Sequence, residues 1–236
     1  MIPGRQISDD GVDQEASIEA GEVKLEGTLG FPKDARAVVL FAHGSGSSRH
    51  SPRNRYVARV LREAGVGTLL FDLLTADEES VDEARGALRF DIPFLAKRLA
   101  DATRWLMQQP DMDTARIGYF GASTGAAAAL VAAAEMRDEI AAVVSRGGRP
   151  DLAGVALARV AAPTLLIVGG EDEPVIGMNR RALAELGSEV KRIAIVPRAT
   201  HLFEEPGTLE EVARLAADWF KRYLANADKA EAQTPT

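Results

Sequence analysis

The sequence predicts an α/β fold in which a mostly parallel sheet of about seven or eight strands has helices on both faces. Short runs of leucine and β-branched residues alternate with longer segments whose apolar residues recur every three or four positions. Most of the short runs are apolar throughout, which is typical of parallel strands that are buried on both sides. The alternation of the two kinds of segment therefore indicates strands joined by crossover helices.

The expected strands are residues 23–29, 37–42, 67–72, 116–120, 141–145, 164–168 and 191–196. The first of them differs from the rest, because Val23, Leu25 and Leu29 alternate with charged and polar residues. A period of two predicts an antiparallel edge strand with one face in solvent. The remaining strands are expected to form the parallel part of the sheet.

Periodicity and terminating residues predict helices over 55–64, 95–109, 126–136 and 209–224. The acidic segment 74–91 has weak periodicity and follows directly from a strand, so a loop with a short helix is expected there. It should lie beside the carboxyl ends of the strands, where ligands bind in sheets of this kind.

Length and composition predict one domain over the 236 residues, with residues 1–16 as an N-terminal extension and 225–236 as a disordered tail. The formal net charge of −7 argues against nucleic acid as a partner. No segment has the apolar length of a membrane span or a signal peptide, so a cytoplasmic protein that does not bind membranes is expected. The absence of cysteine excludes a thiol nucleophile and a thiolate metal site. The oligomeric state is left open.

The sharpest local pattern is Gly121-Ala122-Ser123-Thr124-Gly125, which stands between an expected strand and an expected helix. This is the G-x-S-x-G nucleophile elbow in the context it requires. Its glycines let the helix close onto the strand, while the serine is exposed in a strained conformation. The alternative, a plain turn, is less consistent with this context. Ser123 is therefore the expected nucleophile.

A serine hydroxyl needs a base, and only three histidines are available. His201 follows the last strand, in a loop expected at the same sheet edge as the elbow. A solvated surface histidine is the ordinary alternative, but the position relative to Ser123 favours a base. Activity should accordingly fall below about pH 6 to 7.

The third member should be a carboxylate that orients the imidazole. Glu171, Asp172 and Glu173 all follow the strand 164–168, and spacing alone does not separate them. Asp172 is the preferred candidate. The chain order Ser123, Asp172, His201 is that of α/β-hydrolases rather than of the two serine protease orders.

An oxyanion hole needs two backbone donors. The N–H of Thr124, directly after the nucleophile, is one candidate. The N–H of Ser45, in the loop His43-Gly44-Ser45-Gly46, is the other. This loop lacks the lysine of a phosphate-binding P-loop, and His43 is expected to be a buried residue that supports the loop rather than a base or a metal ligand.

The combination of HGSGSS, GASTG, GGEDEPV and ATHLF resembles the α/β-hydrolase superfamily and, more closely, the dienelactone hydrolase-like group, from about Val23 to Leu224. The resemblance implies the α/β-hydrolase fold. It also implies that the aspartate of a G-x-D-x-x-V pattern, here Asp172, is the triad acid. Dienelactone hydrolases proper use a cysteine nucleophile, so Ser123 favours ordinary ester hydrolysis over dienelactone turnover.

The expected function is hydrolysis of a small-molecule carboxylic ester through an acyl-enzyme, with no metal and no cofactor. Only residues 146–163 separate two consecutive strands, too few for a lid domain, so an open site for small or flexible acyl groups is expected. Arg146 is a candidate for binding a substrate carboxylate, with a salt bridge to Asp91 or Asp151 as an equal alternative. The competing functions are a thioesterase or peptidase on the same triad, or a non-catalytic binding module.

Overall fold

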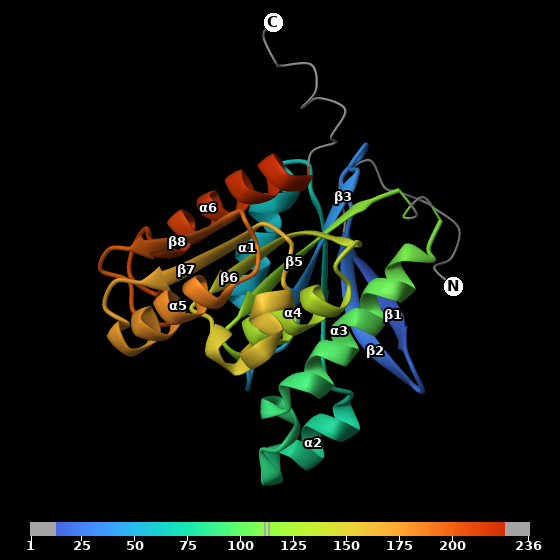
Figure 1. Ribbon diagram of the computed structural model, residues 1–236. Coiled ribbons are helices and arrows are strands. Elements are labelled where there is room, and N and C mark those ends of the chain that lie inside the picture. The colour runs from blue at the N-terminus through green and yellow to red at the C-terminus, as the bar shows by residue number, and fades with distance from the viewer. Residues whose placement is uncertain (1–12, 111, 113, 225–236) are drawn as a thin grey trace, which may run out of the picture.

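The computed structural model describes residues 13–110, 112 and 114–224. At its centre lies an eight-stranded sheet in the order β1-β2-β4-β3-β5-β6-β7-β8 (Figure 1). The strands are β1 (Gln14–Ala20), β2 (Val23–Gly30), β3 (Ala37–Ala42), β4 (Gly67–Phe71), β5 (Arg116–Ala122), β6 (Ile140–Arg146), β7 (Thr164–Gly169) and β8 (Lys191–Val196). From β4 to β8 every neighbouring pair is parallel. The predicted α/β class and mostly parallel sheet are confirmed.

The sheet begins with a hairpin that the sequence analysis missed in part. β2 is antiparallel to β4, as its alternating pattern predicts, but β1 pairs with its other side, so β2 is not the edge strand. Residues 14–16 belong to β1 and not to an N-terminal extension. In β1 the buried positions are Ala16, Ile18 and Ala20, and two alanines make a weak strand signal. The expected tail, 225–236, lies outside the described residues.

Helices cover both faces of the sheet. They are α1 (Pro52–Glu63), α2 (Ala76–Arg85), α3 (Ile92–Met107), α4 (Thr124–Glu135), α5 (Glu173–Glu185) and α6 (Thr208–Leu224), with the 3-10 helices η1 (Leu88–Phe90) and η2 (Pro150–Arg159). Helices α1 and α3 begin three residues earlier than predicted, because Ser51 and Asp91 cap their first turns with side-chain oxygens. None of the described helices is long and apolar enough to cross a bilayer.

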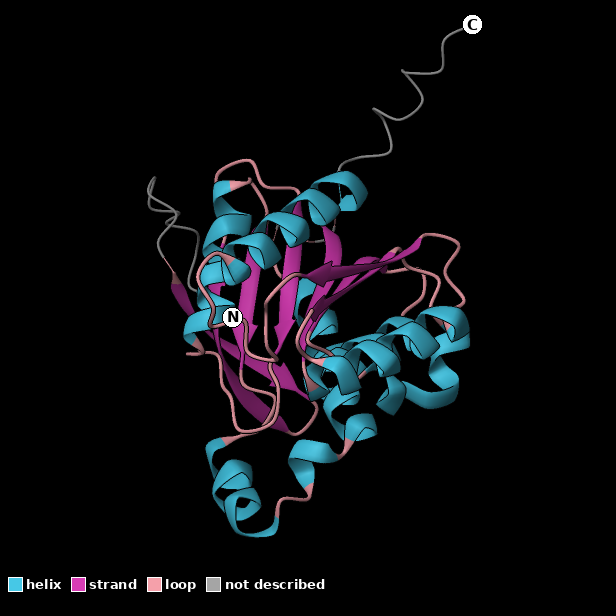
Figure 2. Cartoon of the chain, turned by 90° about the vertical axis from the view of Figure 1, so that its left-hand side faces the viewer, coloured by secondary structure: helices cyan, strands magenta, loops and turns pink. Residues whose placement is uncertain are grey.

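The core has two layers, one on each side of the sheet. Helices lie over both faces (Figure 2). Alternation along β3 divides the two layers: Val38 and Leu40 pack toward α3 and α4, whereas Val39 and Phe41 pack toward α1 and α6. The alanine-rich α4 is buried on nearly all sides, because its small side chains let it lie close to the sheet. This packing fixes the end of β5, where α4 begins.

The acidic segment expected to be a loop with a short helix contains α2 and η1, which project beyond the body of the molecule (Figure 1). A capping box between Thr75 and Glu78 starts α2. The buried carboxylate of Asp82 accepts hydrogen bonds from the backbone N–H groups of Leu88 and Arg89, and from the Arg89 side chain. These polar contacts, more than apolar packing, hold the segment, which explains its weak hydrophobic period.

Candidate active site

Ser123 occupies the sharp turn between β5 and α4. Its φ of 50° and ψ of −121° lie in a region that non-glycine residues rarely adopt. The flanking glycines make the turn possible: a Cβ at Gly121 would collide with the backbone of Ala126, and one at Gly125 with the carbonyls of Ala42 and His43. The close packing around the turn therefore imposes the strained backbone conformation of Ser123 and places this residue at the end of the sheet.

His201 and Asp172 come together from two loops at the carboxyl ends of β8 and β7. The Nδ1 atom of His201 lies 2.7 Å from Oδ2 of Asp172. Of the three acids that the sequence left open, Asp172 is the one whose carboxylate makes this contact. The Asp172 side chain is 13% exposed and that of His201 39%, so the carboxylate is largely shielded while the imidazole reaches solvent.

The turn after β6 brings His201 near the elbow. The N–H of Ser123 donates to the carbonyl of Arg146 at 3.3 Å, and Gly147 follows with a φ of 50°. A Cβ placed on Gly147 would lie 3.6 Å from Cε1 of His201. The imidazole of His201 thus packs against Gly147, the neighbour of Arg146, whose carbonyl accepts the N–H of Ser123. Ser123, Asp172 and His201 therefore share one edge of the sheet.

The loop that follows β3 lies against Ser123 from the other side. A Cβ on Gly44 would lie 3.0 Å from Cβ of Ser123 and 3.7 Å from its Oγ. The next residue, Ser45, donates its N–H to Oγ1 of Thr124 at 2.9 Å. The two backbone segments that carry the predicted oxyanion donors are therefore in direct contact, through a side chain that the sequence analysis did not single out.

His43 supports this loop, as expected. The N–H of Leu73 donates to its Nε2 at 3.1 Å, so the ring proton resides on Nδ1, which donates to the carbonyl of Gly44 at 3.0 Å. Burial lowers the pKa of His43 below its usual value. The ring is therefore a neutral structural group.

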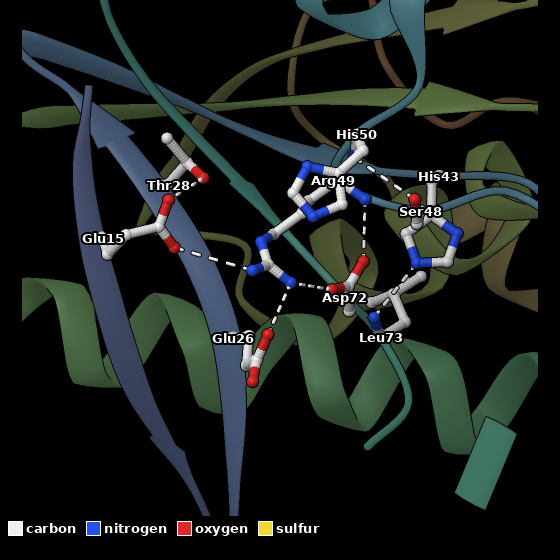
Figure 3. A network of polar contacts seen from close by, with 9 residues as sticks. All are labelled: Glu15, Glu26, Thr28, His43, Ser48, Arg49, His50, Asp72 and Leu73. Atoms are coloured by element: carbon white, nitrogen blue, oxygen red, sulfur yellow. Dashed lines mark hydrogen bonds and ion pairs between the residues drawn. The ribbon is translucent and has the colours of Figure 1, made fainter. Parts of the chain in front are cut away.

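An anchor that was not predicted from the sequence holds the far end of the same loop (Figure 3). The backbone N–H of Arg49 donates to Asp72 Oδ1 at 2.7 Å, and its Nη1 donates to Asp72 Oδ2 at 2.6 Å. The guanidinium also pairs with Glu26 at 2.8 Å and with Glu15 at 3.6 Å. The end of β4 thus clamps the loop at His43 and at Arg49. An acidic residue directly after β4 was the only sequence signal for the clamp.

A cavity of about 150 Å³ opens beside the loop. Its walls are the loop itself, the end of β4 and the segment with α2 and η1, including Leu74, Glu79 and Arg89. The expectation that the acidic segment lies beside the strand ends is confirmed. The cavity and the elbow share Gly44, which lines the cavity and contacts Ser123.

Arg146 does not form either salt bridge considered for it. Asp151 pairs with Arg149 at 2.8 Å, and Asp91 caps the N-terminus of α3. Arg146 is 8% exposed and donates only to Asn54 Oδ1, at 3.5 Å, while its Nε and Nη1 have no partner in the described structure. Burial, and then the nearby Arg53, lower its pKa to about 10. Arg146 forms neither salt bridge because its side chain lies on the α1 side of the sheet, against Asn54.

Comparison with curated proteins finds a relative in Mycobacterium tuberculosis that is named a candidate phosphoribosyl transferase. It is 59% identical over 212 residues, which are 90% of this chain and 47% of that protein. The chain therefore spans about half the length of this relative. An uncharacterized protein of the same organism is 30% identical over 208 residues, covering 79% of this chain and 69% of the relative.

Among solved structures, a dienelactone hydrolase from Anabaena variabilis is 60% identical, with a TM-score of 0.88, covering 90% of this chain and 98% of that one. Est1E from Butyrivibrio proteoclasticus shares the fold with a TM-score of 0.74 at 17% identity, covering 90% and 99%. The model of the dienelactone hydrolase family matches residues 25–228, and this chain, with its α/β-hydrolase fold, belongs to that family.

Proposed function

We propose that this hydrolase cleaves a carboxylic ester through an acyl-enzyme formed on Ser123. In the proposed reaction Ser123 Oγ attacks the ester carbonyl and His201 takes its proton. Asp172 orients the imidazole and stabilises its charged form. The N–H of Thr124 and the N–H of Ser45, the latter directly or through the Thr124 hydroxyl that it bonds, stabilise the negative charge on the carbonyl oxygen. His201 then returns the proton to the leaving alcohol.

The observation that carries the proposal is the 2.7 Å contact between His201 and Asp172 at the sheet edge that holds the strained Ser123. A carboxylate on Nδ1 fixes the tautomer in which Nε2 is free to accept a proton. That arrangement is what a serine nucleophile requires of its base, and a turn with no chemical role would gain nothing from the strain.

The cavity next to the elbow suits a small or flexible acyl group by its size, although none of the three triad residues lines it. Its volume of about 150 Å³ is well below that of pockets for drug-sized ligands. Only η2 and short connections lie between β6 and β7, so this connection contains no lid domain. The proposal includes binding of a substrate carboxylate by Arg146. For this the buried guanidinium must become accessible to the substrate.

The test is labelling with a fluorophosphonate probe followed by mass mapping of the modified peptide. Labelling confined to Ser123, and lost in Ser123→Ala, supports the proposal. Ser145→Ala is the matched control, because Ser145 lies opposite Gly121 on the neighbouring strand and its hydroxyl is fully buried. Folded protein that is neither labelled nor active on any ester would support the non-catalytic binding module instead.

Thioester and amide hydrolysis use the same triad, so matched p-nitrophenyl ester, thioester and anilide substrates separate the three activities. The ester should have the highest kcat/KM. Phosphoribosyl transfer is not proposed for this chain, because the chain matches only 47% of the relative with that name and the hydrolase family model matches residues 25–228.

A further inference from the structure

We propose that the side-chain hydroxyl of Thr124 is a second donor to the oxyanion, beside the backbone N–H of Thr124, and that it stands in for the N–H of Ser45, whose hydrogen bond it accepts. The inference rests on the proposed function, because an oxyanion forms only if Ser123 attacks an acyl carbon. It assigns a catalytic contact to a side chain that the nucleophile elbow pattern leaves unspecified.

The first observation is the direction of the hydrogen bond at Thr124. Oγ1 accepts the N–H of Ser45 at 2.9 Å, so one lone pair of the hydroxyl is used and its own proton is directed elsewhere. Within the described part of the chain, no hydrogen bond donated by this hydroxyl is found. A residue that is only 5% exposed thus keeps an unused donor. Buried donors normally have an acceptor, so this proton is available for a ligand.

The second observation is where the hydroxyl lies. Thr124 is the first residue of α4 and directly follows Ser123, and the residue that bonds its Oγ1 is next to Gly44, which contacts Ser123. The hydroxyl therefore sits between the two backbone segments that flank the nucleophile. A carbonyl oxygen within reach of the Thr124 N–H would therefore lie next to this hydroxyl.

The third argument concerns preorganisation. Threonine is branched at Cβ, which restricts χ1, and the hydrogen bond from Ser45 fixes the rotamer further. A donor that is fixed before the reaction needs no reorganisation when charge develops. The N–H of Ser45 also polarises the hydroxyl that it bonds, which makes the hydroxyl a better donor.

The reaction stays balanced with this additional donor. The bond from Ser123 Oγ to the acyl carbon forms, the π electrons of the carbonyl move to its oxygen, and the serine proton passes to His201. Thr124 keeps its proton and only shares it with the oxyanion. When the intermediate collapses, the alcohol leaves with the proton from His201, and the hydroxyl returns to its resting state.

The experiment compares Thr124→Val, which removes the hydroxyl at nearly constant shape, with Thr124→Ser, which retains it. On p-nitrophenyl butyrate we expect Thr124→Val to lower kcat by about tenfold to a hundredfold, with KM almost unchanged. Thr124→Ser should recover most of the rate. Thr28→Val, on strand β2 away from the site, is the matched control and should keep the wild-type kcat.

A second readout distinguishes a donor from a packing residue. A thionoester places sulfur, a weaker acceptor, in the oxyanion hole, so losing a donor should reduce the rate on the oxygen ester more than on the matched thionoester. We expect the ratio of the oxygen-ester rate to the thionoester rate to fall in Thr124→Val. If valine impairs folding, the same fall is expected in Thr124→Ala. Unchanged or increased kcat in folded Thr124→Val would overturn the inference, because the hydroxyl would then only occupy the hole. Activity surviving in Ser123→Ala would overturn the proposed function itself, which is a separate outcome.

Discussion

The Nδ1 atom of His201 lies 2.7 Å from Oδ2 of Asp172, although the two residues belong to loops after different strands. An asparagine at 172 presents an amide instead of a negative charge and no longer stabilises the imidazolium. We expect Asp172→Asn to lower kcat by about 10³ to 10⁴ with the fold intact, measured by ester hydrolysis at neutral pH.

Glu171→Gln is the control for that substitution, because Glu171 immediately precedes Asp172 and is exposed. It should leave kcat within about twofold of the wild type, as expected for a surface charge. Similar losses in the two variants would mean that the general charge of the loop, and not the contact with His201, is what matters.

The clamp at the end of the loop after β3 leads to a prediction about stability. Asp72 accepts the backbone N–H and Nη1 of Arg49 with a side chain that is 19% exposed. We expect Asp72→Asn to lower the free energy of unfolding by about 1 to 3 kcal/mol, because a largely buried, charge-assisted pair is broken. Urea denaturation measures this.

Glu26→Gln tests the same network at its exposed side. Glu26 also pairs with Arg49, but its side chain is 75% exposed, so the loss should stay below about 1 kcal/mol. An equal loss in both variants would contradict the view that burial makes the Asp72 contact the stronger one. In Asp72→Asn we also expect kcat to fall, because the loop carries Ser45.

Sequence patterns predicted the parts of this molecule that depend on local chemistry. The parallel strands follow from runs that are apolar at every position, and the elbow follows from five consecutive residues whose sizes the turn itself dictates. The paired β1 was missed because Ala16 and Ala20 are small and give little contrast along the strand. Helix α5 was missed because Gly177 weakens its pattern and only Val175, Asn179 and Ala182 are buried along it.

The remaining features depend on contacts between residues far apart in the chain. The choice of Asp172 over Glu171 and Glu173 required the position of the His201 loop, and the contact of Ser45 with Thr124 joins residues 79 positions apart. The environment of Arg146 likewise depends on which face of β6 meets α1. No local pattern carries this information, because the fold sets the distances.

His43 gives a prediction about pH. Burial lowers its pKa from the usual 6.5, although Asp72 and Glu79 act in the opposite direction. The unfolded chain therefore binds this proton more readily than the folded chain. The stability that the neutral ring contributes is complete above about pH 6.5 and is lost as the pH falls toward the lower folded-state pKa.

Unfolding free energies measured from pH 7.5 to 5 should decline by at most about 1.4 kcal/mol per pH unit from this single proton. His43→Gln cannot titrate and can still accept the N–H of Leu73, so its decline should be shallower than that of the wild type. Parallel curves for the two proteins would show that groups other than His43 account for the whole decline.

Arg146 gives the last prediction. Its folded-state pKa of about 10 lies below the usual value of an arginine, so the folded chain binds this proton less readily, and the charge destabilises the fold at every pH below about 10. Methionine fills a similar volume without a charge. We expect Arg146→Met to raise the free energy of unfolding by roughly 1 to 4 kcal/mol. Arg149→Met, which breaks the pair with Asp151, should not stabilise the protein.

The same variant tests the substrate role of Arg146. If the guanidinium binds a substrate carboxylate, Arg146→Met should raise KM for a hemisuccinate ester and leave KM for a neutral ester of the same alcohol unchanged. A buried charge with few partners that lowers stability is a candidate for a functional role. Higher stability together with a selective rise in KM would therefore assign the arginine to binding, whereas equal KM values for the two esters would exclude that role.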